Sequence, residues 1–326
     1  MQGGKRVSRK TSKLRKSFIF FLGLTLVGWV SSVSAGPVII DGTDSDDHGS
    51  ASAGANQLGW LYIQKGFENL APNVGNANKT AVCLGCNGSD ASGGFNSGFD
   101  LSALPGLGWT RTSITGATGI NNYFSNIGTT TLANTGILYM PTNSGQVGGG
   151  ITAAEIAAVN THSTDINTFV GGAGTPAQGG GLFVHSQREV TGGFGWLSTL
   201  IPGIVINECA LGCNSGSLTL TPAGLAALPG LTSTVLSNAT PWHTWFSGDF
   251  GGLSVLVTGP VNNSPVAVAL GGGAGTVIGC GLPGQPPCPE TGVVPEPASL
   301  ILLGTGLAGL AAWRFRKQGS RRDQTP

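Results

Sequence analysis

The chain has 326 residues, of which 56 are glycine and 10% are charged, while 40% are hydrophobic, enough to form a packed core. Its formal net charge of +1 conceals an uneven distribution. Four of the 16 basic residues and 13 of the 15 acidic residues lie between Gly36 and Val294, so this stretch carries a formal charge of −9. An acidic surface repels phosphate, which excludes nucleic acid as a natural partner and favours divalent cations or polar glycans.

The first 35 residues have the three parts of a secretory signal peptide. Seven of the first 16 residues are basic, Phe18 to Val30 are almost wholly apolar, and Val33-Ser34-Ala35 provides small residues at a cleavage site. We therefore predict a signal helix within residues 1–35, export by the Sec machinery, and cleavage by signal peptidase before Gly36.

Residues 36–270 alternate between short apolar runs and amphipathic segments. The apolar runs predict strands at 38–40, 81–84, 137–140, 182–184, 204–206, 253–257 and 266–270. Helices are expected at 60–70, where apolar residues share one face, at 152–170 behind a capping box, and after the N-cap Thr221. Strands that alternate with helices form parallel βαβ units. The predicted fold is therefore α/β, a three-layer sandwich with a mostly parallel sheet, in one exported domain spanning 36–270.

An acidic segment, Asp41-Gly42-Thr43-Asp44-Ser45-Asp46-Asp47-His48-Gly49, directly follows the first predicted strand. The loop beyond the carboxyl end of such a strand faces the usual ligand crevice, and oxygen-rich side chains suit Ca²⁺ or Mg²⁺. The candidate metal ligands are Asp41, Asp44, Asp46 and Asp47. An EF-hand does not fit, because Ala55 stands where the loop requires glutamate. The alternative to a Ca²⁺ site is a solvated, turn-forming acidic loop.

Six cysteines lie in the exported stretch, namely Cys83, Cys86, Cys209, Cys213, Cys280 and Cys288. An even number of cysteines in an oxidising compartment favours disulfides, and the close spacing favours the local pairs Cys83–Cys86, Cys209–Cys213 and Cys280–Cys288. The sequence also leaves open a zinc site built from the first four cysteines and a redox-active Cys-x-x-Cys motif.

Residues 37–260 resemble the class I glutamine amidotransferase-like superfamily. The resemblance is carried by a strand that ends in Tyr139-Met140-Pro141, a capped helix that closes on Phe169-Val170-Gly171-Gly172, and the run Gly180-Gly181-Leu182-Phe183-Val184-His185-Ser186. It implies a strand-to-helix elbow that presents a nucleophilic cysteine. In this chain His185 and Ser186 stand at the elbow in place of the cysteine.

Ser186 could act as a nucleophile only with a base and a group that orients the base. The candidate bases are His243 and His185, and Asp249 is a candidate acid. In the alternative interpretation Ser186 caps a following helix and His185 is a surface or rim residue, without catalysis. The sequence favours this non-catalytic interpretation.

The C-terminal region changes composition twice. Residues 271–293 are rich in glycine and proline, which is typical of a spacer. Pro295-Glu296-Pro297 follows, then an apolar run at 298–313 and the basic cluster Arg314-Phe315-Arg316-Lys317. Together these features, in residues 294–318, resemble the PEP-CTERM sorting signal, which implies a single transmembrane helix at 298–313 and cleavage by exosortase. A permanent, uncut membrane anchor is the alternative.

The two terminal signals predict a protein that is exported across the inner membrane, transiently anchored, and released to the cell surface or extracellular space. The resemblance to sorted proteins implies a structural or binding role in the extracellular matrix, in an exopolysaccharide or biofilm context. Its expected partners are exosortase, signal peptidase and the membrane, with exopolysaccharide as a further candidate. The alternative is an extracytoplasmic hydrolase, directed at amides or glycans, with a degenerate amidotransferase-like site.

Overall fold

A computed structural model describes residues 36–145, 148–171, 178–187, 192–208, 218–239, 242–250, 252–259 and 265–270. The predicted signal peptide, spacer and sorting segment lie outside these residues. Within the described part of the chain, no helix combines the length and the apolar character needed to cross a membrane.

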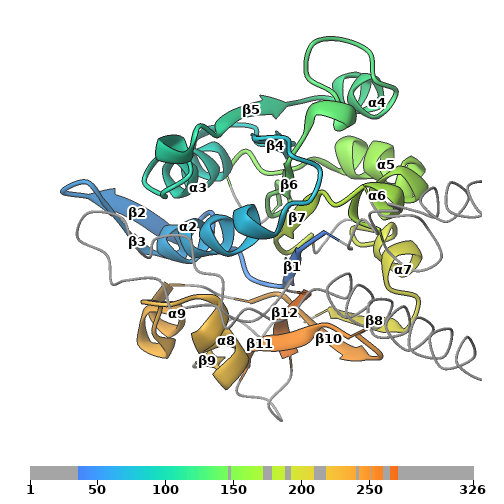
Figure 1. The fold of residues 1–326 in the computed structure, drawn as a ribbon. Coiled ribbons are helices and arrows are strands. Elements are labelled where there is room, and N and C mark those ends of the chain that lie inside the picture. The colour runs from blue at the N-terminus through green and yellow to red at the C-terminus, as the bar shows by residue number, and fades with distance from the viewer. Residues whose placement is uncertain are drawn as a thin grey trace, which may run out of the picture.

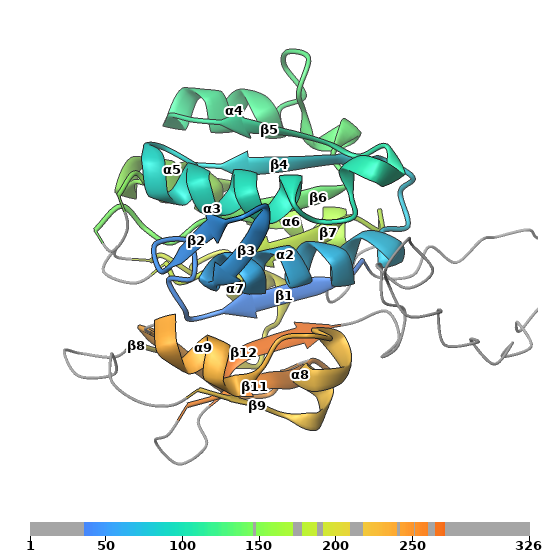
Figure 2. The ribbon, with the colours of Figure 1, turned by 90° about the vertical axis from the view of Figure 1, so that its left-hand side faces the viewer.

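The centre of the fold is an eight-stranded sheet with the strand order β5-β4-β6-β7-β1-β12-β11-β9 (Figures 1 and 2). Five neighbouring strands are parallel, namely β5 (Thr110–Ile114), β4 (Thr80–Leu84), β6 (Ile137–Met140), β7 (Gly181–Val184) and β1 (Val38–Asp41). The other three are antiparallel to their neighbours, namely β12 (Pro265–Leu270), β11 (Ser254–Thr258) and β9 (Thr219–Leu220). The predicted α/β class with a parallel sheet is thus confirmed for five strands.

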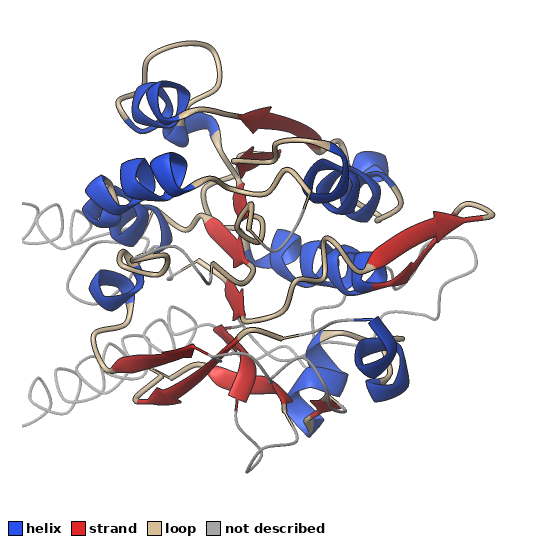
Figure 3. Ribbon diagram, turned by 180° about the vertical axis from the view of Figure 1, so that it is seen from behind, coloured by secondary structure: helices blue, strands red, loops and turns tan. Residues whose placement is uncertain are grey.

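Helices cover both faces of the sheet (Figures 1 and 3). One face carries α2 (Gly59–Leu70), α3 (Ser89–Asp100), α8 (Pro222–Ala227) and α9 (Ser233–Ala239). The opposite face carries α4 (Ala117–Phe124), α5 (Ala153–Thr161), α6 (Ser163–Val170) and α7 (Leu197–Leu200). Two hydrophobic clusters, one on each face, join the helices to the sheet, as expected when strands are buried on both faces.

The neighbouring parallel strands β7 and β1 are followed by helices on opposite faces of the sheet. The chain leaves β1 towards α2, whereas it leaves β7 towards α7 on the other face. The carboxyl ends of such a pair of parallel strands form a topological switch point, where ligands of α/β proteins usually bind. The acidic segment that follows β1 therefore lies at the position where a site is expected.

All seven predicted strands are present, but three of them are not parallel. The run at 204–206 belongs to β8 (Ile204–Glu208), which pairs antiparallel with β10 (Thr244–Gly248) in a separate ribbon, and the runs at 253–257 and 266–270 form the antiparallel strands β11 and β12. The expectation of parallel pairing was wrong for these runs because apolar continuity reports burial and not strand direction.

The predicted helix at 152–170 is divided into α5 and α6 at His162, whose backbone leaves the helical region with φ −108° and ψ 22°. Its ends are as predicted, since Thr152 and Glu155 form the capping box and Gly171 ends α6 in the left-handed conformation. Thr221 also caps α8 as predicted, accepting a hydrogen bond from Gly224 N.

The sequence did not predict β5, α3, α4 or the hairpin of β2 (Gly49–Ser52) and β3 (Ala55–Leu58). Short 3-10 helices occur at Ala71–Asn73, Pro105–Leu107 and Leu132–Asn134. The helix α3 is rich in glycine and serine, which are poor helix formers. Its glycines permit close packing, because a Cβ at Gly94 would lie 2.9 Å from Asp46 Cα.

An aromatic cluster fixes α2 and α3 against the sheet. The ring of Phe67 lies 5.6–5.9 Å from those of four buried aromatic residues, namely Phe95, Phe99, Tyr139 and Phe183. Three of these four contacts are edge-on, the arrangement that aromatic quadrupoles favour.

We expect Phe67→Ala to lower the free energy of unfolding by about 3–5 kcal/mol, because it leaves a cavity among these rings. The control is Ile127→Ala, at a side chain that is 59% exposed, for which the change should stay within about 0.5 kcal/mol. Chemical denaturation of both variants measures the difference. Equal, small effects would show that the cluster does not hold the two helices to the sheet.

Candidate functional site

A buried polar cluster occupies the carboxyl ends of β6, β7 and β1. It comprises Asp41 at the end of β1, Thr43, Asp44, Ser45 and Asp46 after β1, Thr142 and Asn143 after β6, His185, Ser186 and Gln187 after β7, and His243 and Thr244 at β10. The exposed fractions of Asp41, Asp44 and Asp46 are only 0–2%. The alternative of a solvated acidic loop is therefore wrong for these three carboxylates, whose neighbours come from distant parts of the chain.

Asp41 is surrounded by donors. Its Oδ1 accepts hydrogen bonds from the backbone N and the hydroxyl of Thr43, at 2.8 and 2.7 Å. Its Oδ2 accepts a hydrogen bond of 2.9 Å from the hydroxyl of Tyr62, on α2, and lies 3.0 Å from Nδ1 of His185. Both carboxylate oxygens are thus occupied by the protein.

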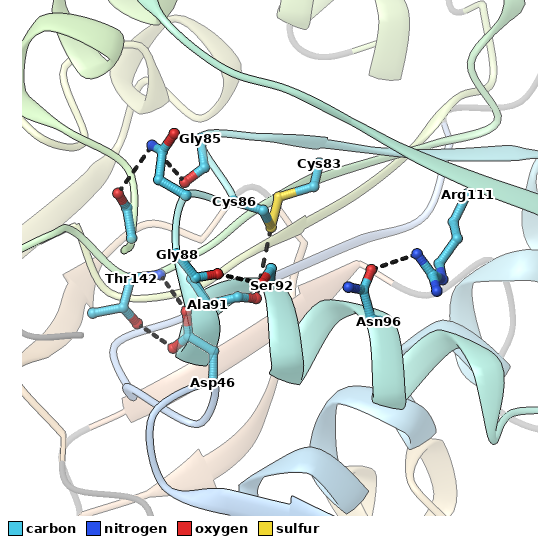
Figure 4. Close-up of a disulfide and its surroundings, with 12 residues drawn as sticks. Asp46, Cys83, Gly85, Cys86, Gly88, Ala91, Ser92, Asn96, Arg111 and Thr142 are labelled. Carbon is cyan, nitrogen blue, oxygen red and sulfur yellow. Dashed lines mark hydrogen bonds between the residues drawn. A yellow bond between two sulfur atoms is a disulfide. The ribbon is translucent and has the colours of Figure 1, made fainter. Parts of the chain in front are cut away.

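Asp46 is bound by one residue through two hydrogen bonds. The hydroxyl of Thr142 donates to Oδ1 at 2.7 Å and the backbone N of Thr142 donates to Oδ2 at 3.0 Å (Figure 4). Burial raises the pKa of Asp46, although the charge of His185 and the bonds from Thr142 act in the opposite direction. This pair joins the turn after β1 to the end of β6.

Asp44 faces two histidines. Its Oδ2 lies 3.0 Å from Nε2 of His243 and 3.5 Å from Nε2 of His48. Burial alone raises the pKa of Asp44, but the interactions with the two histidines outweigh burial and hold the pKa below its ordinary value. The other oxygen, Oδ1, is buried and has no hydrogen-bond partner among the described residues.

His185 is completely buried, so the prediction of a surface or rim residue was wrong. Its ring is enclosed by the rings of Phe183, Tyr139 and Tyr62, at 4.7, 5.1 and 6.1 Å. Burial lowers the pKa of His185, but the neighbouring charges of Asp41, Asp46 and Asp44 outweigh it, and the pKa is raised. A protonated His185 offsets part of the buried negative charge.

Ser186 is also fully buried, and its contacts hold the backbone in place. Its N donates to Thr43 O at 3.0 Å and its O accepts from Asn143 N at 3.1 Å. Its hydroxyl lies 3.4 Å from the hydroxyl of Thr244. The predicted helix after Ser186 would begin within residues 188–191, which lie outside the described residues, and the next helix that the structure describes, α7, has Trp196 at its N-cap.

Each candidate base faces an aspartate. His185 faces Asp41 and His243 faces Asp44, while Asp249 lies beyond the end of β10 and is exposed. The backbone of His243 is tied to the acidic turn, since its N donates to Gly42 O at 2.7 Å. This close approach requires glycine, because a Cβ at Gly42 would lie 1.7 Å from Thr244 O.

The predicted metal ligands do not act as one set. Within the described residues, the side chains that bring three potential ligand atoms within 4.8 Å of one another are Asp44, Asp47 and His48. Asp41 and Asp46 are bound by protein donors instead, which disfavours the predicted Ca²⁺ site of four carboxylates. Sequence reasoning overlooked Tyr62 and Thr142, which carry no motif and are recognised only from their contacts with Asp41 and Asp46.

Cys83, in β4, and Cys86, in the loop before α3, form a disulfide (Figure 4). This is one of the predicted local pairs, and it contradicts a zinc site that uses these two sulfurs. Cys83 is completely buried and Cys86 Sγ lies 3.7 Å from Ala91 O, inside the first turns of α3. The predicted partners Cys209, Cys213, Cys280 and Cys288 lie outside the described residues.

Comparison with known proteins gives one match. Residues 293–317 match the PEP-CTERM protein-sorting motif, at the position where the sequence predicted it. No curated protein and no solved structure matches the chain, so the expected relationship to glutamine amidotransferases has no support. The chain therefore carries the sorting signal of exported proteins that exosortase processes at the membrane, and the signal indicates a surface or extracellular location.

The raised pKa of His185 predicts how stability depends on pH. A histidine whose pKa in the folded state exceeds the ordinary value of 6.5 contributes stability that is fully present below that value and is lost as the pH rises through the folded-state pKa. We expect the free energy of unfolding to fall over this range in the wild type and to fall less in His185→Gln. Denaturant titrations across the range measure both slopes, with His162→Gln as the control. Parallel profiles for the wild type and His185→Gln would contradict the assignment.

Proposed function

We propose that the protein is an exosortase-sorted surface or extracellular-matrix protein whose exported α/β domain has a structural or binding role without catalysis. The observation that carries the proposal is the match of residues 293–317 to the PEP-CTERM motif. The exopolysaccharide or biofilm setting is part of the proposal.

We infer the order of export, anchoring and cleavage from the segments at 1–35 and 294–318. Residues 1–35 direct export, and the apolar run at 298–313 holds the chain in the membrane while exosortase acts at Pro295-Glu296-Pro297. The spacer at 271–293 keeps the domain clear of the lipid surface. Release then places the domain of residues 36–270 outside the inner membrane.

The geometry of the polar cluster supports a role without a serine nucleophile. Ser186 is completely buried, and its hydroxyl lies 3.4 Å from the hydroxyl of Thr244. A hydrolase would require access of a substrate to the serine hydroxyl. The acidic charge of the exported stretch favours cations or polar glycans as partners over nucleic acid.

Replacing Pro295, Glu296 and Pro297 by alanine in the native host should block processing. Mass spectrometry of the wild-type mature protein should find no peptide beyond Pro297, while the variant should retain peptides that contain Arg321 and Arg322 in the membrane fraction. The matched control replaces Pro286 and Pro287 of the spacer, which should leave processing unchanged. Intact C-terminal peptides in the wild-type mature pool would contradict the proposal and indicate a permanent anchor.

A further inference from the structure

Three side chains on one turn converge at the partly exposed edge of the polar cluster. Nε2 of His48 lies 3.5 Å from Oδ2 of Asp44 and 3.6 Å from Oδ2 of Asp47, and the ligand atoms of all three residues lie within 4.8 Å of one another. In a tetrahedral site with metal–ligand distances of about 2.0–2.1 Å, neighbouring ligand atoms are about 3.3 Å apart. The three side chains are therefore spaced like ligands of a single metal ion.

The carboxylate of Asp44 supplies an independent indication of a missing ligand. Its Oδ1 is buried without a hydrogen-bond partner among the described residues, and the side chain is only 3% exposed. A buried acceptor is costly to leave unsatisfied, and an ion or an ordered water molecule commonly satisfies such an atom. A cation bound to this carboxylate would offset the charges of Asp44 and Asp47 together, and bidentate binding would also satisfy Oδ1.

Backbone hydrogen bonds fix the positions of the three residues. Asp47 N and His48 N both donate to Asp44 O, at 3.1 and 3.3 Å, and Gly59 N donates to His48 O at 3.0 Å. His243 approaches Asp44 Oδ2 to 3.0 Å from the start of β10, which fixes the orientation of the carboxylate. Such outer partners are typical of metal sites, in which they orient the ligands.

We propose that Asp44, Asp47 and His48 bind a divalent transition-metal ion, with Zn²⁺ as the representative, and that His243 positions Asp44. Imidazole nitrogen is a ligand for Zn²⁺ and related ions, whereas Ca²⁺ takes six to eight oxygen ligands, more than this turn offers. The side chains of His48 and Asp47, 40% and 30% exposed, give the ion a path from solvent. The site goes beyond the sorting proposal and does not depend on it.

Isothermal titration of the full-length chain, purified in detergent and stripped of metal with a chelator, tests the site with Zn²⁺ alone. We expect one Zn²⁺ per chain and a loss of affinity of at least about tenfold in His48→Gln and in Asp47→Asn, since even loss of an outer partner costs about 10–100-fold. These positions are partly exposed, so both variants should fold. The matched control is His162→Gln, which removes the histidine of the His162–Asp165 pair, 2.7 Å apart, and should bind as the wild type does.

Co²⁺ absorption spectra provide the second readout, because coordination by His48 should give a spectrum that His48→Gln loses. The assignment is overturned if the wild type binds no Zn²⁺, if His48→Gln and Asp47→Asn bind as tightly as His162→Gln, or if millimolar Ca²⁺ displaces Co²⁺. Each of these results leaves exosortase processing untouched, so the sorting proposal is judged separately.

Discussion

The structure depends on how three carboxylates are accommodated in the interior at the end of β1. Removing a charged group from water costs several kcal/mol unless hydrogen bonds and opposite charges compensate. Asp41 is compensated by Thr43, Tyr62 and His185, and Asp46 by Thr142. Asp44 is compensated on one oxygen by His243 and His48. The turn is stable only when partners from other elements are in place.

These contacts connect the elements that surround the switch point. Tyr62 lies on α2, Thr142 follows β6, His185 follows β7, and His243 precedes β10. The turn after β1 is therefore held from both sides of the sheet edge. The same constraint explains why Ser186 is buried, since its backbone bridges Thr43 and Asn143. In this structure the elbow position is part of a packed polar network, which is different from the exposed nucleophile that the amidotransferase resemblance implied.

The sequence predicted those features that local patterns determine. Continuous apolar runs located seven strands, and the caps at Thr152 and Thr221 located helix starts, because both signals lie within a few residues. Strand direction at β11 and β12 and the glycine-rich helix α3 depend on packing, which local propensity does not encode. The C-terminal sorting motif was recognised because its features are contiguous.

The polar cluster was predicted only in part. The acidic residues and His185 were identified, but their burial was not, because the partners are remote in sequence. Thr142 is 96 residues from Asp46, and His243 is 199 residues from Asp44. A run of aspartates beside glycine and serine resembles a solvated turn when its partners are unknown. Tyr62 belongs to an amphipathic helix and gave no sign that its hydroxyl meets Asp41.

A double-mutant cycle between Asp41 and His185 tests the central claim most directly. Unfolding free energies of Asp41→Asn, His185→Gln and the double variant give the interaction energy of the buried pair. Residues in one network couple by about 0.5–3 kcal/mol, and we expect a stabilising value in this range. The reference cycle pairs Asp41→Asn with His162→Gln, because the ring of His162 stacks on Phe124 and is not part of the polar cluster. The effects of these two substitutions on the free energy of unfolding should add to within about 0.3–0.5 kcal/mol. Additive effects of Asp41→Asn and His185→Gln would contradict the view that this pair organises the carboxyl edge of the sheet.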